Sequence, residues 1–359
     1  MLNKELELKF GYVGHATDLF EIFKNIGKVS DQNVEHLDNT YFDTPNKDLF
    51  AIKAGLRIRR SVDYCEQTLK VKGENIGGLH KRNEYNVDIK RSAEVPNLSK
   101  FPNEAFPKSF DIDAIQKKLE KVCRINFTRN LFNVELLDSV FEVAYDNGFI
   151  ETRDGAKHPL NELEVELKET KVKNEDILDL FSLLCTQLAN NNIPLVLEPF
   201  SKMHRAALLQ DEQDQLINLC DFTATTSLSD YLRKQVSIFE KLYGYYLINR
   251  DTTVFSLFVE NLDNLIKSLK YMKKRKVLAF IKGQKEPLDY TSDLNIILRQ
   301  LKSFYRVCAK CKHRILKARI YENTALNDEL FDKVRTCELE QKIFVIPLKL
   351  RLLLSLIVK

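Results

Sequence analysis

Apolar and polar residues alternate one by one along much of the chain before residue 200, which is the pattern of β-strands. Turn motifs such as Thr44-Pro45-Asn46 and Asp146-Asn147-Gly148 separate the alternating segments. Helical patterns interrupt them at 15–26, 112–122 and 174–189, and the mixture favours an antiparallel barrel. The predicted strands are Leu2–Phe10, Glu35–Phe42, Gly55–Arg60, Glu66–Val71, Lys81–Ile89, Asn126–Val134, Ser139–Tyr145, Phe149–Arg153 and Asn161–Lys168.

The hydrophobic period changes after about residue 227, where apolar residues recur at i, i+3, i+4 and i+7. Polar residues 211–215 and the Thr/Ser-rich segment 223–229 mark the boundary, and 359 residues suit two domains. We therefore predict a β-rich domain over 1–206, a linker over 207–226 and an all-α helical bundle over 227–359. The predicted helices are Tyr231–Leu247, Val254–Met272, Ser292–Ile315 and Ala325–Val334.

The charged residues of several predicted strands share one face. In Glu5–Lys9 the charges alternate with leucines, and Arg57–Arg59, Lys70–Lys72, Arg82–Glu84 and Glu162–Lys168 repeat the arrangement. Any one of these strands also fits the solvent-exposed face of a sandwich. Taken together, acids on the first and a late strand and bases on the middle ones would repel their neighbours on a plain surface. The pattern predicts a lumen where carboxylates hold divalent cations and Lys and Arg hold a polyphosphate.

Charge is divided unevenly between the two halves of the chain. Residues 1–214 hold 29 Lys+Arg and 36 Asp+Glu, a charge of −7, whereas residues 215–359 hold 26 and 15, a charge of +11; the two sum to the net +4. This asymmetry favours a polyanionic partner for the second half. A helical bundle with a solvated basic surface is the alternative.

Cysteine usage and hydropathy favour a cytoplasmic location. The seven cysteines are odd in number and scattered, and no secretory signal is recognised. Cys308 and Cys311 form a CxxC without the second pair that a zinc site would need. The apolar ending Phe344–Val358 is interrupted by charges and is shorter than the roughly 20 residues of a membrane span, so it predicts a core helix.

The segment Glu5–Lys9 resembles the ExExK signature of the CYTH superfamily, the triphosphate tunnel metalloenzymes. Thr68–Val87 is most similar to bacterial inorganic triphosphatases that join a CYTH domain to a CHAD domain. The helical half fits a CHAD domain in position and charge but lacks its His-x-x-Arg-Val pattern. Further matching motifs follow in order at Thr40–Pro45, Gly55–Arg59, Thr68–Gly73, Gly77–Glu84, Tyr145–Gly148, Glu162–Leu167 and Ser201–Lys202.

The resemblance implies an α+β domain with a closed antiparallel eight-stranded β-barrel, and it implies roles for individual residues. The implied ligands of Mg²⁺ or Mn²⁺ are Glu5, Glu7, Asp146, Glu162, Glu164 and Glu166. The implied phosphate-binding residues are Lys9, Arg57, Arg59, Lys70, Lys72, Arg82, Arg129 and Lys202. Glu5, Glu7, Lys9, Arg57 and Arg59 would be catalytic, and Glu84 would orient a neighbouring arginine.

The function implied is metal-dependent hydrolysis of inorganic triphosphate to pyrophosphate and phosphate. No Ser/His/Asp or Cys/His arrangement is visible, so a covalent intermediate is not indicated. Thiamine triphosphate, a nucleoside triphosphate, or cyclisation of ATP by an adenylate cyclase are alternatives in the same barrel. A polyphosphate-binding module without turnover is an alternative of another class. Long-chain polyphosphate is the expected partner of the helical half, and neither nucleic acid nor a membrane is expected.

Overall fold

The computed structural model describes residues 4–71, 74–76, 79–173, 176–210, 227–277, 279, 286, 289–318 and 324–356. The chain divides by its contacts into two units. The first comprises residues 1–75, 79–172 and 200–210, and the second comprises residues 76–78, 173–199 and 211–359. The units are therefore interleaved in sequence, and the domain limits predicted at 206 and 227 stay a prediction. Most of the predicted linker, 211–226, lies outside the described residues.

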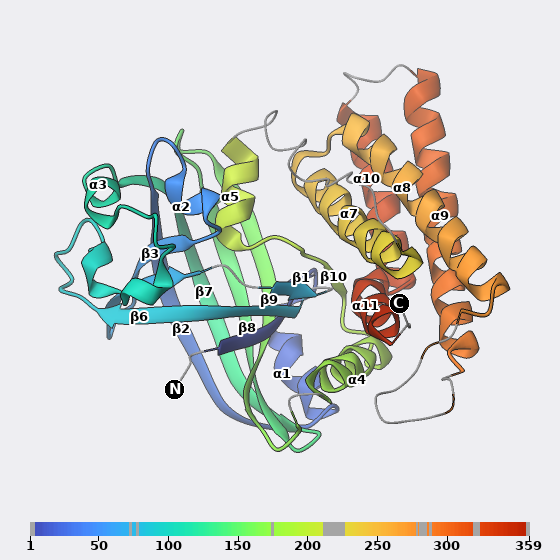
Figure 1. Cartoon of the computed structure of the whole chain (residues 1–359), viewed down its shortest axis with the longest axis horizontal. Helices are drawn as coiled ribbons and strands as arrows, with labels where there is room; N and C mark the ends of the chain where they lie inside the picture. Colours follow the sequence, from blue (N-terminus) through green and yellow to red (C-terminus); the bar gives the residue numbers. More distant parts are fainter. Residues whose placement is uncertain are drawn as a thin grey trace. The chain divides into compact units, whose positions relative to one another are not determined.

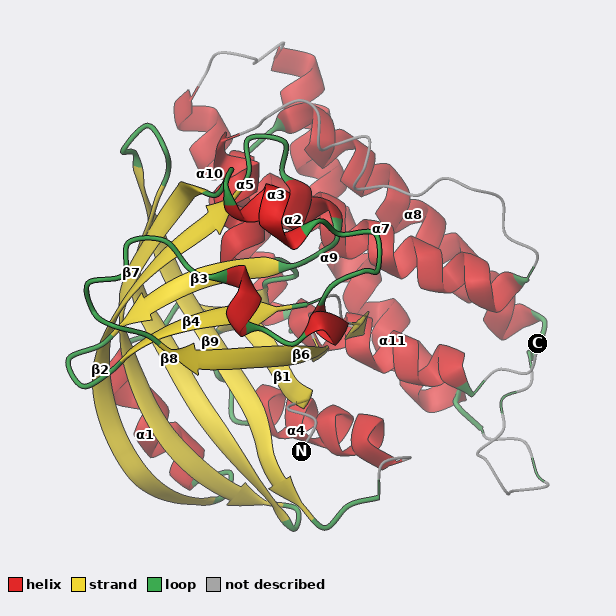
Figure 2. Cartoon of the chain, turned by 60° about the vertical axis from the view of Figure 1, so that its left-hand side comes forward, coloured by secondary structure: helices red, strands yellow, loops and turns green. Residues whose placement is uncertain are grey.

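The first unit is built on antiparallel strands of one curved sheet, in the order β1-β9-β8-β7-β2-β3-β4-β6-β5 (Figures 1 and 2). An additional pairing joins β1 to β6, from Lys4 opposite Asn83 to Leu8 opposite Leu79. The strands are β1 (Lys4–Tyr12), β2 (Lys28–Asp43), β3 (Gly55–Arg60), β4 (Cys65–Lys70), β5 (Glu74–Ile76), β6 (Leu79–Asp88), β7 (Glu120–Leu136), β8 (Ser139–Glu151) and β9 (Lys157–Thr170).

The predicted α+β unit with a large antiparallel sheet is confirmed, but the prediction of a closed eight-stranded barrel needs correction. Among the residues that the structure describes, the first unit contributes nine strands, and their order runs from β1 to the short β5. The strand that the sequence does not reveal is β5, which has only three residues. A period of two cannot be recognised over so few positions.

Two predicted local features are also corrected. Asp146-Asn147-Gly148 is not a turn, because β8 continues through it and pairs with β7 along its whole length. A Cβ atom on Gly148 would lie 2.1 Å from the carbonyl oxygen of Asn126, so glycine serves the close approach of the two strands there. The helix predicted over 112–122 stops early, since β7 begins at Glu120.

Short helices cover the apolar side of the first unit. Side chains such as Leu8, Phe10, Leu163 and Val165 alternate with charged residues and are fully buried. One apolar cluster joins β2, β3 and β4 to the segment around Phe101. The helices are α1 (Ala16–Lys24), α2 (Asp48–Ala51), η1 (Leu98–Lys100), η2 (Asn103–Ala105), α3 (Ile112–Gln116) and α5 (Lys202–Gln210).

The second unit is a bundle of helices, as predicted, in which α7, α8, α9 and α10 pack in chain order (Figure 1). The buried carboxylate of Glu338 accepts hydrogen bonds from the Leu197 backbone N–H at 2.7 Å and the Tyr243 hydroxyl at 2.6 Å. No helix in the described ranges is both apolar and long enough to span a membrane. The elements are α4 (Ile177–Asn190), β10 (Leu195–Leu197), α7 (Leu228–Asn249), α8 (Thr252–Lys274), α9 (Thr291–Ala318), α10 (Thr324–Glu340), η4 (Ile343–Val345) and α11 (Ile346–Ser355).

Candidate functional site

Strand register gathers the charged residues of the first unit into cross-strand rows. β1 and β9 are neighbours, so the first and the late acidic strand lie side by side: Lys9 is opposite Glu164. On the next pair of strands Asp146 is opposite Glu162, and the small Ala144 is opposite Glu164. Because residues directly opposite share a face of the sheet, the acids separated in sequence converge on one surface.

Three carboxylates form the centre of this surface. Asp146 and Glu162 are completely buried and Glu164 is 14% exposed at its side chain. One oxygen from each lies within 4.8 Å of the others, close enough to share a metal ion. All three belong to the six ligands implied by the sequence, and an all-oxygen donor set suits a hard cation such as Mg²⁺ or Mn²⁺.

Lysine and arginine side chains surround the carboxylates. Arg129 donates to both oxygens of Asp146, at 2.7 and 2.8 Å, and to Glu164 at 2.7 Å. The Lys202 ammonium lies 2.8 Å from an oxygen of Asp146, 2.8 Å from one of Glu164, and also contacts Glu162. The ammonium of Lys9 is 3.7 Å from Glu162 and from Glu164. Buried charges of both signs thus neutralise one another, as burial requires.

Their surroundings shift the pKa values of Glu162 and Glu164 in opposite directions. Burial raises the pKa of Glu162 to about 7, against the opposing effect of Lys202 and Lys9. Burial also acts to raise the pKa of Glu164, but Lys202 and Arg129 outweigh it and hold that pKa well below the ordinary range. Glu164 is therefore the ionised member of the pair at neutral pH, and Glu162 is the one that accepts a proton more readily.

A second part of the same charged network lies on β1, β3, β4 and β6. The Lys70 ammonium is 2.7 Å from Glu5 and 2.9 Å from Glu84, and a guanidinium nitrogen of Arg57 is 3.4 Å from Glu84. Glu84 is thus close enough to orient Arg57, as expected. Burial lowers the pKa of Arg59, and the nearby positive charges of Arg57 and Arg129 lower it further. Arg59 thus feels the positive charges of two other arginines, and guanidinium groups are suited to binding phosphate oxygens.

The remaining residues implied by the sequence either do not belong to the group of three carboxylates or are not described in full. Glu7 is buried, 3.7 Å from the Lys9 ammonium, and Glu166 contacts Lys168 at 2.9 Å. Neither belongs to the group of three carboxylates that share a possible metal position. The backbone of Arg82 lies opposite Glu5, but its side chain is not described. Lys72 lies outside the described residues.

Three residues that the sequence did not single out contact the network. A guanidinium nitrogen of Arg205 lies 3.6 Å from Glu162, and its position three residues after Lys202 on α5 could have indicated a shared helical face. Asn39 is buried and accepts a hydrogen bond from Arg59 at 2.9 Å. Glu142, 3.1 Å from Lys168, has the same strand parity as Asp146 and could have been found from the alternation.

The family model of the CYTH domain matches residues 3–188. This is more than half of the chain, so the protein belongs to the CYTH domain family. The match ends at residue 188, and the likeness of the helical half to a CHAD domain stays a prediction.

Similarity to individual proteins is partial. An inorganic triphosphatase of Haemophilus influenzae is 34% identical over 146 residues, which are 40% of this chain and 38% of that protein, so less than two fifths of the relative is matched. A proposed adenylyl cyclase of Hippeastrum, described as having a dominant triphosphatase activity, covers 56% of this chain and 95% of its own at 17% identity and a TM-score of 0.39. A Pyrococcus horikoshii protein covers 57% and 98% at 19% identity and a TM-score of 0.35.

Proposed function

We propose that the protein hydrolyses inorganic triphosphate to pyrophosphate and phosphate on the charged face of its sheet. The observation that carries this proposal is the meeting of Asp146, Glu162 and Glu164 with rows of Lys and Arg on one buried surface. The carboxylates of such a surface complement a metal ion, and its Lys and Arg side chains complement phosphate groups. Membership of the CYTH family and the likeness to an inorganic triphosphatase support it.

The carboxylates Asp146, Glu162 and Glu164 would hold the divalent cation. Their donor atoms are all oxygens, and one buried oxygen of Glu162 has no hydrogen-bond partner among the described residues, which fits a ligand position. When bound, the cation supplies charge neutralisation on the phosphate oxygens and activates water. Glu5 and Lys70, 2.7 Å apart, belong to the second part of the same charged network.

The chain's own cations would bind and orient the triphosphate. Arg57 and Arg59 share a face of β3, and guanidinium groups bind phosphate oxygens in pairs. Glu84 and Asn39 hold the two arginines in place through contacts of 3.4 and 2.9 Å. Fixing a triphosphate in line with its attacking water needs little further chemistry from the protein, because phosphoryl transfer depends mainly on position and charge.

A panel of substrates tests the proposal. Phosphate release is measured from tripolyphosphate, ATP and thiamine triphosphate, with Mg²⁺, with Mn²⁺ and with excess EDTA, and ATP is also assayed for cyclic AMP. We expect tripolyphosphate to be cleaved fastest and only with a divalent cation. Equal rates on ATP would move the substrate to nucleoside triphosphates, and cyclic AMP would indicate a cyclase. Binding of tripolyphosphate without turnover under every condition would leave a binding module.

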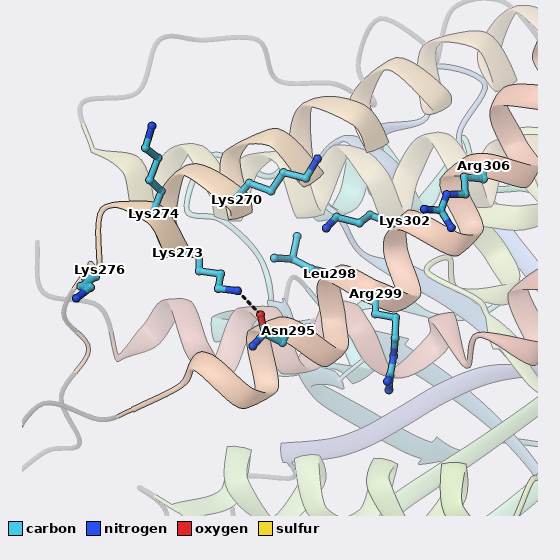
Figure 3. Close-up of a pocket in the computed structure, with 9 residues that line it drawn as sticks. All are labelled: Lys270, Lys273, Lys274, Lys276, Asn295, Leu298, Arg299, Lys302 and Arg306. Carbon is cyan, nitrogen blue, oxygen red and sulfur yellow. Dashed lines mark hydrogen bonds between the residues drawn. The ribbon is translucent and has the colours of Figure 1, made fainter.

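A second function, binding of long-chain polyphosphate, is favoured by an open groove of about 620 Å³ in the helical unit (Figure 3). Lys270, Lys273 and Lys274 of α8 contribute to its lining, and Asn295, Leu298, Arg299, Lys302 and Arg306 follow one another along α9 at helical spacing. Lys276 completes the lining, which contains seven cations and no acid. Lys273 donates to Asn295 at 2.5 Å.

The cations of this groove differ from others in the helical unit. In the described part of the chain, none of the seven has an ion pair with a carboxylate, whereas Lys267 pairs with Asp263 and Lys312 pairs with Glu260. Unpaired like charges repel, so a ligand that supplies several negative charges along a line stabilises them. The lining contains no aromatic side chain for a base to stack on, which favours a bare phosphate chain over a nucleic acid.

Binding of long-chain polyphosphate to the full protein tests the groove. The variant Lys273→Gln/Lys302→Gln/Arg306→Gln is compared with Lys267→Gln/Lys312→Gln/Lys333→Gln, which removes three cations that have acidic partners. We expect the groove variant to lose about tenfold or more in affinity at low salt and to show a weaker dependence on salt. An equal loss in the control would show that net charge, and not the groove, attracts the polyanion.

A further inference from the structure

Lys202 is the cation that contacts all three carboxylates of the candidate metal site. Its ammonium lies 2.8 Å from Asp146 and 2.8 Å from Glu164, and it donates a hydrogen bond to Glu162. These contacts use the same group of oxygens that lie within 4.8 Å of one another. A divalent cation and the Lys202 ammonium therefore need the same place, and both cannot be there at once.

The balance of charge leads to the same conclusion. Asp146, Glu162, Glu164 and Glu7 carry up to four negative charges, and Lys9, Arg129, Lys202 and Arg205 carry four positive ones. Adding a divalent cation to this set without moving a side chain would leave a buried surplus of positive charge, which is costly at low dielectric. One of the four cations has to withdraw.

Contacts within the first unit indicate which cation can do so. Arg129 is held in place by three hydrogen bonds to Asp146 and Glu164. Lys9 lies within a strand paired on both sides and is 3.7 Å from its acidic partners. Lys202 is the first residue of α5, and its long side chain carries a point charge that can turn away by rotation about single bonds.

The helix itself can stay where it is while this side chain turns. Ala206 of α5 is 1% exposed and belongs to an apolar cluster with Tyr41 and Phe127. Met203 and Leu209 pack against the same cluster. A second observation points to a ligand at this place: the Oε2 atom of the fully buried Glu162 has no hydrogen bond from any described residue, and a guanidinium nitrogen of Arg205 lies 3.6 Å from it.

We propose that the Lys202 ammonium is an internal substitute for the metal ion. It neutralises Asp146, Glu162 and Glu164 before a divalent cation binds, and it withdraws when the cation takes its place. The affinity for the metal is then set by a competition within the chain. This inference rests on the proposed use of a divalent cation by the same carboxylates, and it assigns Lys202 a positioning role in addition to the phosphate contact implied by the sequence.

Metal binding by the full chain without substrate tests the inference. The affinity for Mn²⁺ is measured by calorimetry for the native chain and for Lys202→Met, Lys202→Arg and Lys28→Met. Methionine keeps much of the side-chain volume but removes the charge, so we expect Lys202→Met to bind Mn²⁺ about tenfold or more tightly than the native chain. Lys202→Arg keeps the charge and should bind as weakly as the native chain. The exposed side chain of Lys28 forms an ion pair with Glu135 at 3.3 Å, so its replacement should leave the affinity for Mn²⁺ unchanged.

Thermal unfolding gives a second measurement. Without metal, Lys202→Met leaves four carboxylates facing three cations, so its melting temperature should fall. Mn²⁺ should raise the melting temperature of this variant by more than it raises that of the native chain. A Lys202→Met chain that folds only with Mn²⁺ would agree with the inference. Equal or weaker Mn²⁺ affinity in a folded Lys202→Met chain would overturn it.

The outcomes keep this inference separate from the proposed function. If Lys202→Met gains affinity for Mn²⁺ while the native chain cleaves no triphosphate, the competition exists and the proposed function fails. If the native chain cleaves triphosphate with Mn²⁺ while Lys202→Met shows no gain in affinity, the proposed function holds and the competition fails.

Discussion

Glu164 contacts three cations of the first unit. Its Oε1 atom accepts a hydrogen bond from Lys202 at 2.8 Å, its Oε2 atom accepts one from Arg129 at 2.7 Å, and Lys9 lies 3.7 Å away. Because these cations lower its pKa well below the ordinary range, Glu164 is charged at neutral pH. It is both a candidate metal ligand and the group that fixes the two cations beside it.

Replacing Glu164 by glutamine tests this role. The amide binds a divalent cation poorly and no longer neutralises Lys202 and Arg129, so we expect tripolyphosphate turnover to fall by about 100-fold or more. The measurement is the initial rate at saturating Mn²⁺, with circular dichroism to verify the fold. Glu169→Gln, an exposed change on the same strand, is the control and should keep the native rate. Near-native turnover in Glu164→Gln would remove Glu164 from the site.

The sequence predicts which charged residues of a strand share a face, but not which residues of the neighbouring strand they contact. Alternation along β1 and β9 was enough to predict that Glu5, Glu7, Glu162 and Glu164 share faces, because the side-chain period of a strand is fixed. The alternation does not predict that Arg129 lies opposite Asp146, because this pairing depends on the register between β7 and β8. Such pairings arise from the whole sheet and are visible only in three dimensions.

At the level of elements, β7 and β8 form the hairpin that carries Arg129 and Asp146. Leu137 and Asp138, with φ of 53° and 54°, connect the two strands, and pairing extends from Leu136–Ser139 to Arg124–Glu151. The sequence predicted two strands broken at Asp146-Asn147-Gly148, because asparagine followed by glycine is the commonest signal of a tight turn. Here glycine is required because the backbone of β7 lies too close for a side chain. A local sequence pattern contains no information on such a partner strand.

Adding a methyl group at Gly148 tests this explanation. Its Cβ would lie 2.1 Å from the Asn126 carbonyl oxygen and 2.5 Å from the Phe127 Cα, both backbone atoms of β7. We expect Gly148→Ala to lower the free energy of unfolding by about 2 kcal/mol or more, because the two backbones must separate. Gly55→Ala is the matched control, since its Cβ would meet only the Met203 sulfur at 3.4 Å. Chemical unfolding of both variants measures the difference, and equal stabilities would contradict the explanation.

On the scale of the whole molecule, the two units are interleaved along the sequence and are not divided at a single position. All the candidate metal and phosphate residues precede Ala206, yet α4 and β10, which also precede it, belong to the helical unit. A helix was predicted over 174–189, and the structure has α4 at Ile177–Asn190, in the helical unit by its contacts. Its apolar face is plain in the sequence, but periodicity does not show which other apolar face covers it. In the structure α4 packs against α11 and η4.

This arrangement makes a prediction about a chain shortened to residues 1–210. Leu180, Phe181, Leu184 and Leu188 of α4 are at most 3% exposed, and the shortened chain would lose the helices α7–α11 that make up most of their unit. Exposing each such side chain costs about 1.5–3 kcal/mol, so an apolar surface of this size promotes association.

We therefore expect the shortened chain to melt at a lower temperature and to form soluble aggregates, although it keeps every described residue of the candidate site. Size-exclusion chromatography and thermal unfolding measure both effects. A second shortened chain, with Leu180→Lys and Leu184→Glu added, should recover the monomer if exposure of α4 is the cause, and it should then hydrolyse tripolyphosphate. A monomeric shortened chain with native melting temperature would show that α4 needs no cover. A monomeric, folded one without activity would show that the helical unit takes part in the chemistry.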